Sequence, residues 1–128
     1  MPVVDLEKSK SFYTAMGFEN NPQFTDETSA CMVGSDAINV MLHTHAKWKT
    51  FTTRPIPPSS SSEVLLAISC ESKGMVDDMN EKATAHGGTA EINPKQDLGF
   101  MYNRNLADPD GHVWEAMCMD MAAFPKEK

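Results

Sequence analysis

One acidic residue in an otherwise apolar strand is the side chain best placed to do chemistry. After the turn sequence at 108–111, residues 113–119 alternate as a strand does, and this alternation places Val113, Glu115, Met117 and Met119 on one face. An ionised carboxylate on such a face is costly unless a metal, a partner or water meets it. We therefore predict that Glu115 is a catalytic general base or a polar anchor for a ligand, with Met117 contacting the ligand beside it.

A second group of candidates lies on an earlier strand. Residues 38–45 alternate, so that Asn39, Met41, His43 and His45 share one face. Two imidazoles together with Glu115 are a set that can hold Zn, Ni, Mn or Fe(II) with positions open for substrate. The simpler interpretation, which we favour, is that the histidines line or border a pocket without a metal.

Three further side chains are predicted to contact a ligand. Tyr102 and Arg104 lie on the strand before the turn, where Arg104 could pair with Glu115 or with a carboxylate ligand, and either Tyr102 or Asn103 should face the pocket. Trp48 begins a linker-like segment and should cover apolar surface. That surface could belong to the linker itself, to a dimer partner or to the mouth of a cavity.

The order of predicted elements repeats once along the chain. A helix capped by Asp5 ends at Gly17, and a second helix capped by Ser72 ends at 87–88; each follows a strand and precedes three strands. The first helix has an apolar stripe of Leu6, Phe12, Tyr13 and Met16, and the second has one of Met75, Val76, Met79 and Ala83. The strands are expected at 1–4, 19–24, 29–33, 38–45, 64–70, 89–93, 99–106 and 112–119.

The predicted fold is therefore α+β, with two βαβββ modules in a single domain spanning 1–128. Module 1 covers about 1–45 and module 2 about 63–120. The segment 46–62 between them contains three prolines and four consecutive serines, a composition typical of a linker.

Short motifs at both ends of the chain resemble one known superfamily. The turn at 108–111 followed by Glu115, the opening residues 2–6, and the residues 11–13 and 17–18 are similar to passages of the glyoxalase/bleomycin resistance/dioxygenase (vicinal oxygen chelate) proteins. The run at 99–104 resembles a functionally vague glyoxalase-like branch of that superfamily. The resemblance implies that each module curls its mixed sheet into a half-open cup around a pocket.

The resemblance also implies a metal site whose ligands are incomplete here. Metal-binding members use side chains on the first, fourth, fifth and eighth strands. Glu115 matches the eighth-strand position, and Met41 or His43 matches the fourth, depending on the register. Residues 64–68 offer no ligand type, and the first-strand position would precede Met1. We therefore expect the divalent metal to be absent, although His45 could restore part of the set.

Two functions follow from the resemblance. The favoured one is a protein that binds an apolar or amphiphilic small molecule in a sheet-lined cleft, as bleomycin-resistance proteins do. The alternative is a metal-dependent enzyme, a glyoxalase I-like lyase or isomerase or a dioxygenase, that uses Glu115 with His43 and His45. The open sheet edges and the apolar side chains around Trp48 predict a homodimer.

Composition narrows the partners and the compartment. The formal net charge of −7 and a pI near 4.9 argue against nucleic acid and anionic membranes as partners. The start of the chain lacks a secretory pattern, and Cys31, Cys70 and Cys118 have no C-x-x-C spacing. We expect reduced thiols in a cytoplasmic protein.

Overall fold

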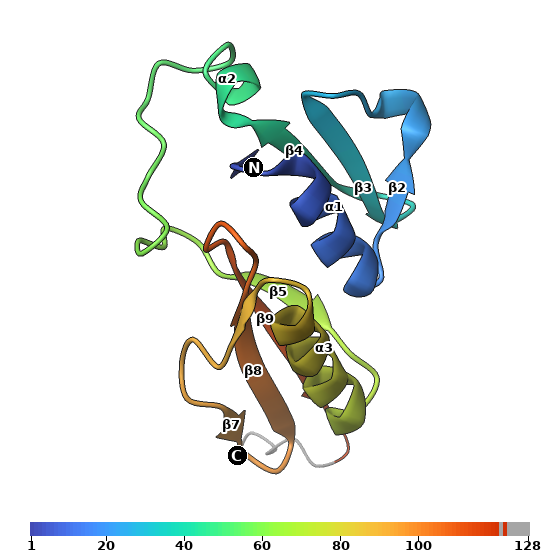
Figure 1. Cartoon of the computed structure of the whole chain (residues 1–128). Coiled ribbons are helices and arrows are strands. Elements are labelled where there is room, and N and C mark those ends of the chain that lie inside the picture. The colour runs from blue at the N-terminus through green and yellow to red at the C-terminus, as the bar shows by residue number, and fades with distance from the viewer. Residues whose placement is uncertain (121, 123–128) are drawn as a thin grey trace.

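Two mixed sheets, each with a helix, make up the chain in the computed structural model, which describes residues 1–120 and 122 (Figure 1). The first sheet has the strand order β1-β4-β3-β2 and the second has β5-β9-β8-β6, with β7 also paired to β8. β1 is parallel to β4 and β5 is parallel to β9, whereas the other pairs are antiparallel. The α+β class and the two βαβββ modules predicted from the sequence are confirmed.

The strands of the first sheet are β1 (Pro2–Val3), β2 (Glu19–Asn21), β3 (Ser29–Ser35) and β4 (Ile38–Thr44). Those of the second sheet are β5 (Leu66–Ser69), β6 (Thr89–Ala90), β7 (Gln96–Asp97), β8 (Met101–Ala107) and β9 (Val113–Met119). The sequence pattern did not predict β7, because its two residues are polar and have no apolar alternation. The predicted strand at 19–24 is shorter than expected, since its second half is the 3₁₀ turn η1 (Pro22–Phe24).

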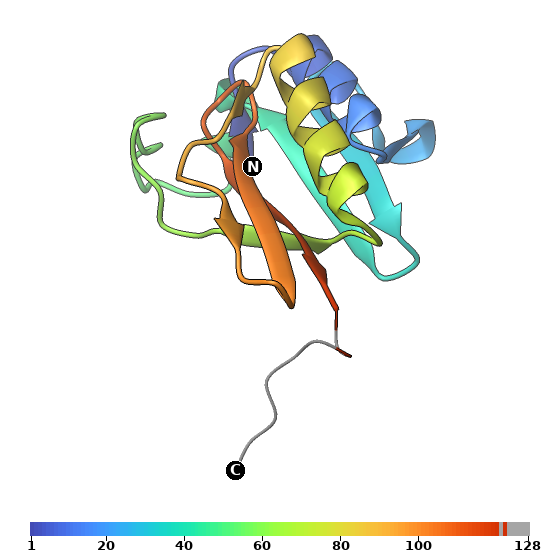
Figure 2. The ribbon, with the colours of Figure 1, turned by 90° about the horizontal axis from the view of Figure 1, so that it is seen from below.

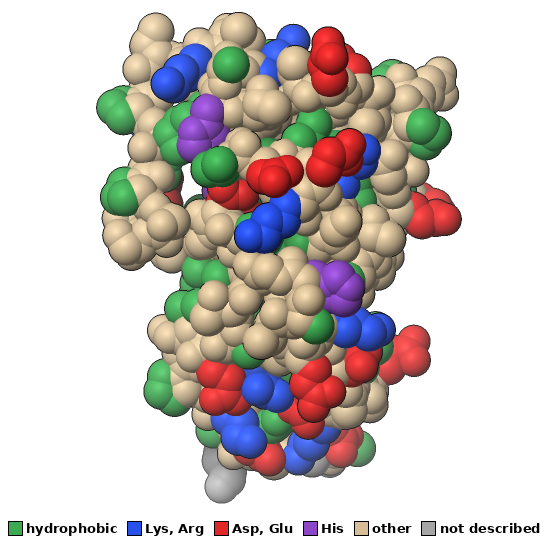
Figure 3. All heavy atoms as spheres, viewed as in Figure 1, with side chains coloured by type: hydrophobic (Ala, Val, Ile, Leu, Met, Phe, Trp, Pro, Cys, Tyr) green, Lys and Arg blue, Asp and Glu red, His purple; other side chains and the backbone are tan. Residues whose placement is uncertain are grey.

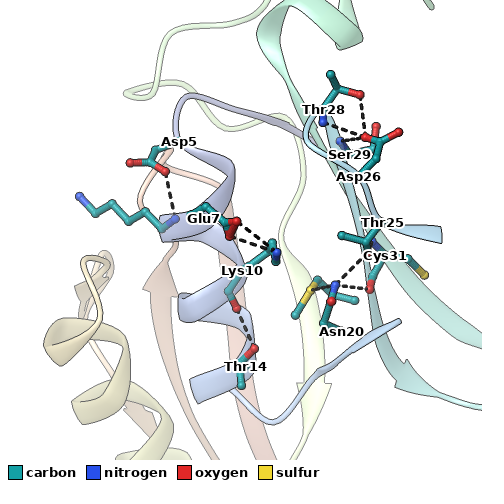
Figure 4. Close-up of polar contacts among 12 residues, drawn as sticks. Asp5, Glu7, Lys10, Thr14, Asn20, Thr25, Asp26, Thr28, Ser29 and Cys31 are labelled. Carbon is teal, nitrogen blue, oxygen red and sulfur yellow. Dashed lines mark hydrogen bonds and ion pairs between the residues drawn. The ribbon is translucent and has the colours of Figure 1, made fainter. Parts of the chain in front are cut away.

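The two long helices begin at the predicted caps. α1 (Leu6–Ala15) starts after Asp5, whose carboxylate accepts a hydrogen bond from the Lys8 backbone N–H at 3.1 Å (Figure 4). α3 (Lys73–Ala85) starts after Ser72, whose hydroxyl accepts from the Met75 N–H. A third, short helix, α2 (His45–Trp48), occupies the beginning of the linker.

The apolar stripe of each helix packs into the core largely as predicted. Leu6, Phe12, Tyr13 and Met16 of the first stripe are all buried. On α3, Val76, Met79 and Ala83 are buried, but Met75 is 45% exposed and its predicted core position is wrong. Met75 lies in the first turn of α3, one residue before the first buried position of the helix, Val76.

One core joins the two modules. α1 and α3 lie on the same side of the molecule, and the side chains that face them from both sheets form a single apolar cluster (Figure 2). The Trp114 ring of β9 contacts the rings of Tyr13 and Phe18, with centroids 6.0 and 5.8 Å apart. Since Tyr13 and Phe18 belong to the first module, the helix-facing sides of both sheets are used for this core, and the opposite sides are left for other contacts.

The outer surface of the helices is charged. Acidic and basic side chains intermingle over α1 and α3 in the view of Figure 3. Two ion pairs form within these helices, Lys10–Glu7 on α1 and Lys82–Asp78 on α3. Within residues 1–120 and 122, no helix is long and apolar enough to cross a membrane.

Candidate functional site

Glu115 lies on the face of the second sheet that points away from α3. Its neighbours along β9, Trp114 and Ala116, are buried in the core, so alternation turns Glu115 and Met117 to the other face. Glu115 stands directly opposite Asn105 on β8 and Ala67 on β5. The Glu115 side chain is half-buried, and within the described part of the chain its carboxylate has no hydrogen bond or ion pair.

Two asparagines of β8 place amide groups on the same face. Asn103 and Asn105 are buried there, and β7 pairs with β8 at Asn103. The Asn103 side-chain N–H donates to Gln96 at 3.3 Å, and Asn93 donates to the Asn105 oxygen at 2.7 Å. The Asn105 side-chain nitrogen is buried without a partner among the described residues, across the strand from Glu115. The face therefore offers one free carboxylate and one free amide donor, in register with each other.

The sequence pattern left Asn103 as one of two choices and did not point to Asn105. The register of β8 against β9 is the signal that identifies them, since residues directly opposite Glu115 and Met117 must share their face. That register depends on the turn at 108–111, whose closing bond runs from the Asp108 N–H to the His112 oxygen.

Tyr102 and Arg104 lie on the opposite face from Glu115, so the expected contact between Arg104 and Glu115 is wrong. The Tyr102 hydroxyl donates to Asp77 of α3 at 2.6 Å, and the Arg104 guanidinium pairs with Asp77 at 2.9 Å and with Glu91 at 2.8 Å. The Tyr102 and Arg104 contacts hold the pKa of the Asp77 carboxyl below its usual value. These two side chains attach α3 to its sheet.

His43 lies on the corresponding face of the first sheet. Its Nδ1 is 2.7 Å from the Ser29 hydroxyl, and the Phe51 and Trp48 rings lie beside it at centroid distances of 4.9 and 6.3 Å. Burial, followed by the positive charges of the N-terminus and Lys47, lowers the pKa of His43, which favours the neutral imidazole at pH 7. Met41 is two residues earlier on the same face.

His45 and Trp48 belong to α2 rather than to a strand. β4 ends at Thr44, whose hydroxyl caps the short helix that begins at His45. This placement takes His45 off the face that carries Met41 and His43. Trp48 lines a cleft of about 310 Å³ together with Met1, Pro57 and Leu66, between the first strand of each module. Trp48 therefore lines a cleft together with a linker residue.

Comparison with known proteins identifies the architecture. A family model for the bleomycin resistance protein-like N-terminal region matches residues 1–35. A hypothetical protein from S. aureus superposes with a TM-score of 0.78 at 22% identity, over 92% of this chain and 88% of that one. A glyoxalase/bleomycin resistance protein/dioxygenase family enzyme from Burkholderia phytofirmans superposes with a TM-score of 0.75 at 18% identity. This match covers 93% of this chain and 94% of that one. This chain has the glyoxalase/bleomycin resistance fold.

The same fold occurs in a fosfomycin resistance protein from Listeria monocytogenes, with a TM-score of 0.64 at 15% identity over all of this chain and 90% of that one. No curated protein matches the sequence. Both kinds of match support the superfamily resemblance that the sequence motifs indicated.

The metal-ligand candidates named from the sequence lie apart from one another. Within residues 1–120 and 122, no three His, Cys, Asp or Glu side chains gather closely enough to hold a metal ion. Glu115 and His43 are on separate sheets, and His45 has turned away into α2. The set of His43, His45 and Glu115 considered from the sequence is therefore not assembled within one chain.

Proposed function

We propose that the face around Glu115 binds a small amphiphilic molecule whose polar end donates hydrogen bonds or carries a positive charge. The observation that carries this proposal is the unpartnered Glu115 carboxylate on a strand face beside the apolar Met117. A half-buried carboxylate without a cationic partner is best satisfied by a ligand that brings the donor with it. The free amide nitrogen of Asn105 supplies one donor for an acceptor on the same ligand.

We also propose that this site works without a tightly bound metal. The support is the dispersal of His43, His45 and Glu115 over two sheets and a helix. One or two protein ligands leave a divalent ion mostly water-bound, and such sites are weak beside the three or four ligands typical of zinc. Elemental analysis of the purified protein tests this point. Stoichiometric Zn, Ni, Mn or Fe that is lost in Glu115→Gln would favour the enzyme alternative instead.

We further propose that a second copy of the chain contacts the open edges of the two sheets. In the described part of the chain β1 pairs with β4 alone and β5 with β9 alone, so each leaves an unpaired edge. Val64 and Leu65, just before β5, are 59% and 54% exposed. An apolar segment beside an open edge is a typical dimer contact. Sedimentation at micromolar concentration tests this, and a clean monomer would contradict it.

The ligand-binding proposal is tested with naphthylmethylamine, a cation on an apolar double ring, in an amide NMR titration. We expect saturable shifts at Asn103, Asn105, Glu115 and Met117. Glu115→Gln removes the charge and keeps the shape, and should weaken binding about fivefold or more, the size of an ion pair with limited exposure. The control is Glu19→Gln, which neutralises an exposed carboxylate on β2 and should leave binding unchanged. Shifts that avoid β8 and β9 would refute the proposal.

A further inference from the structure

A second hollow lies away from the Glu115 face, beneath the linker. The linker passes outside α2 and the end of β1, and the space between them is visible as an opening on the left of Figure 3. The cleft has a volume of about 560 Å³, within the range of small-molecule sites. Its walls are α2, the linker prolines, the residues around β1, and the turn before β9.

One wall of this cleft presents basic side chains without partners. His45 and Lys49 are four residues apart, which places them on one face of α2 and its C-terminal cap. Within the described residues neither side chain makes a hydrogen bond or an ion pair. Lys47 in the same helix differs, because its ammonium lies 5.6 Å from the centroid of the Phe51 ring and it does not line the cleft.

The acidic and imidazole groups on the opposite wall are already engaged. The Asp110 carboxylate accepts from the Val4 N–H at 2.9 Å and from the Ser9 hydroxyl at 3.3 Å. The His112 Nε2 donates to the Pro2 carbonyl oxygen at 2.8 Å. Asp110 therefore lowers the positive potential of the cleft without forming an ion pair with His45 or Lys49, and the cleft suits a singly charged anion better than a doubly charged one.

The remaining wall is apolar and has few hydrogen-bonding groups. It consists of Pro55, Ile56, Pro57 and Pro58. The three proline rings have no backbone N–H to donate, so this wall can contact a flat apolar body without leaving donors unsatisfied.

We propose that the linker cleft binds a small monocarboxylate with an aromatic or aliphatic ring body. The carboxylate lies against Lys49 and His45, and the ring packs on the linker prolines. The site shares no residue with the Glu115 face and takes a ligand of opposite charge. Its existence is therefore independent of the function proposed above.

An amide NMR titration of the full chain with naphthoate tests this inference. We expect saturable shifts at Val4, Lys49, Ile56 and Asp110. Lys49→Met should weaken binding about fivefold, the contribution of a partly exposed ion pair. Lys47→Met removes the same charge from the same helix outside the cleft, and should change the affinity less than about twofold. Neither lysine is buried, so both variants are expected to fold.

Two probes with the same ring but different charge test whether the cleft recognises a single negative charge. Naphthalenemethanol, which has no charge, should bind more weakly than naphthoate. Naphthyl phosphate should bind no more tightly than naphthoate. Equal binding of the neutral alcohol, tighter binding of the phosphate ester, equal effects of the two lysine variants, or no saturable shift would each overturn the inference. Naphthylmethylamine binding at the Glu115 face is detected by shifts on β8 and β9, whereas naphthoate binding is detected by shifts around the linker cleft. The absence of binding at one site can therefore be distinguished from its absence at the other.

Discussion

Removing one buried hydroxyl, in Tyr13→Phe, should destabilise the whole chain. The Tyr13 hydroxyl donates to the Asp108 carboxylate at 2.6 Å and accepts from the Trp114 indole N–H at 3.0 Å. Tyr13 belongs to α1 of the first module, whereas Asp108 and Trp114 belong to the second. Burial first, and then the negative charge of Asp108, raise the pKa of Tyr13, which keeps its hydroxyl protonated as a donor.

The magnitude follows from what the substitution leaves behind. Tyr13 and Asp108 are 1% and 3% exposed, so water does not replace the lost hydroxyl. One Asp108 oxygen and the Trp114 N–H both lose their partner, since the other Asp108 oxygen is held by the N–H groups of Asp110 and His112. A buried polar group left unsatisfied costs about 1–3 kcal/mol, so two of them cost about 2–6 kcal/mol. This is a large part of the stability of an ordinary domain, about 5–15 kcal/mol.

Urea unfolding followed by far-UV circular dichroism measures this effect. The matched control is Tyr102→Phe. The Tyr102 hydroxyl donates to the Asp77 carboxylate, but the Asp77 side chain is 44% exposed and keeps its ion pair with Arg104 when the hydroxyl is removed. Water can replace that hydroxyl, so the control should lose less than about 1 kcal/mol. If the two variants lose the same free energy of unfolding to within about 0.5 kcal/mol, the buried network does not hold the modules together as argued.

Two further predictions concern stability. The pKa of Asp77 is lowered by the Tyr102 and Arg104 contacts, so its stabilising effect is present above its usual pKa and is lost as the pH falls below it. The urea midpoints of wild type and Asp77→Asn should therefore draw together as the pH falls from about 5 to below 3.8, and a constant difference would contradict this. Gly88→Ala should cost more than about 2 kcal/mol, because the new methyl group would overlap the Ala107 carbonyl oxygen and lie 2.6 Å from the Phe12 ring. Gly74→Ala on α3 would bring the new methyl group only to within 3.7 Å of the Ser72 hydroxyl, so it should instead stabilise by about 0.5–1 kcal/mol, and thermal melts compare the two.

The candidate site was only partly predictable from the sequence. Alternation in β9 was enough to predict the face of Glu115 and Met117, because the side-chain period of a strand is two and Trp114 had to be buried. The same rule failed for Arg104. Alternation within β8 does not determine which of its faces lies on the same side of the sheet as the Glu115 face of β9. Asp77 and Glu91, which bind Arg104, are 27 and 13 residues away along the chain, so tertiary packing decided its direction.

The sequence by itself determined the elements and their repeat, since caps such as Asp5 and Ser72 and the apolar stripes act within a few residues. Only the tertiary structure decided how the two modules share a core and what the linker encloses. His45 shows the difference: its spacing from His43 predicted a common strand face, but β4 ends at Thr44 and α2 turns His45 towards the linker prolines. A strand's end depends on its neighbours, and β3, which pairs with β4, extends no further than the Ser29–His43 pair.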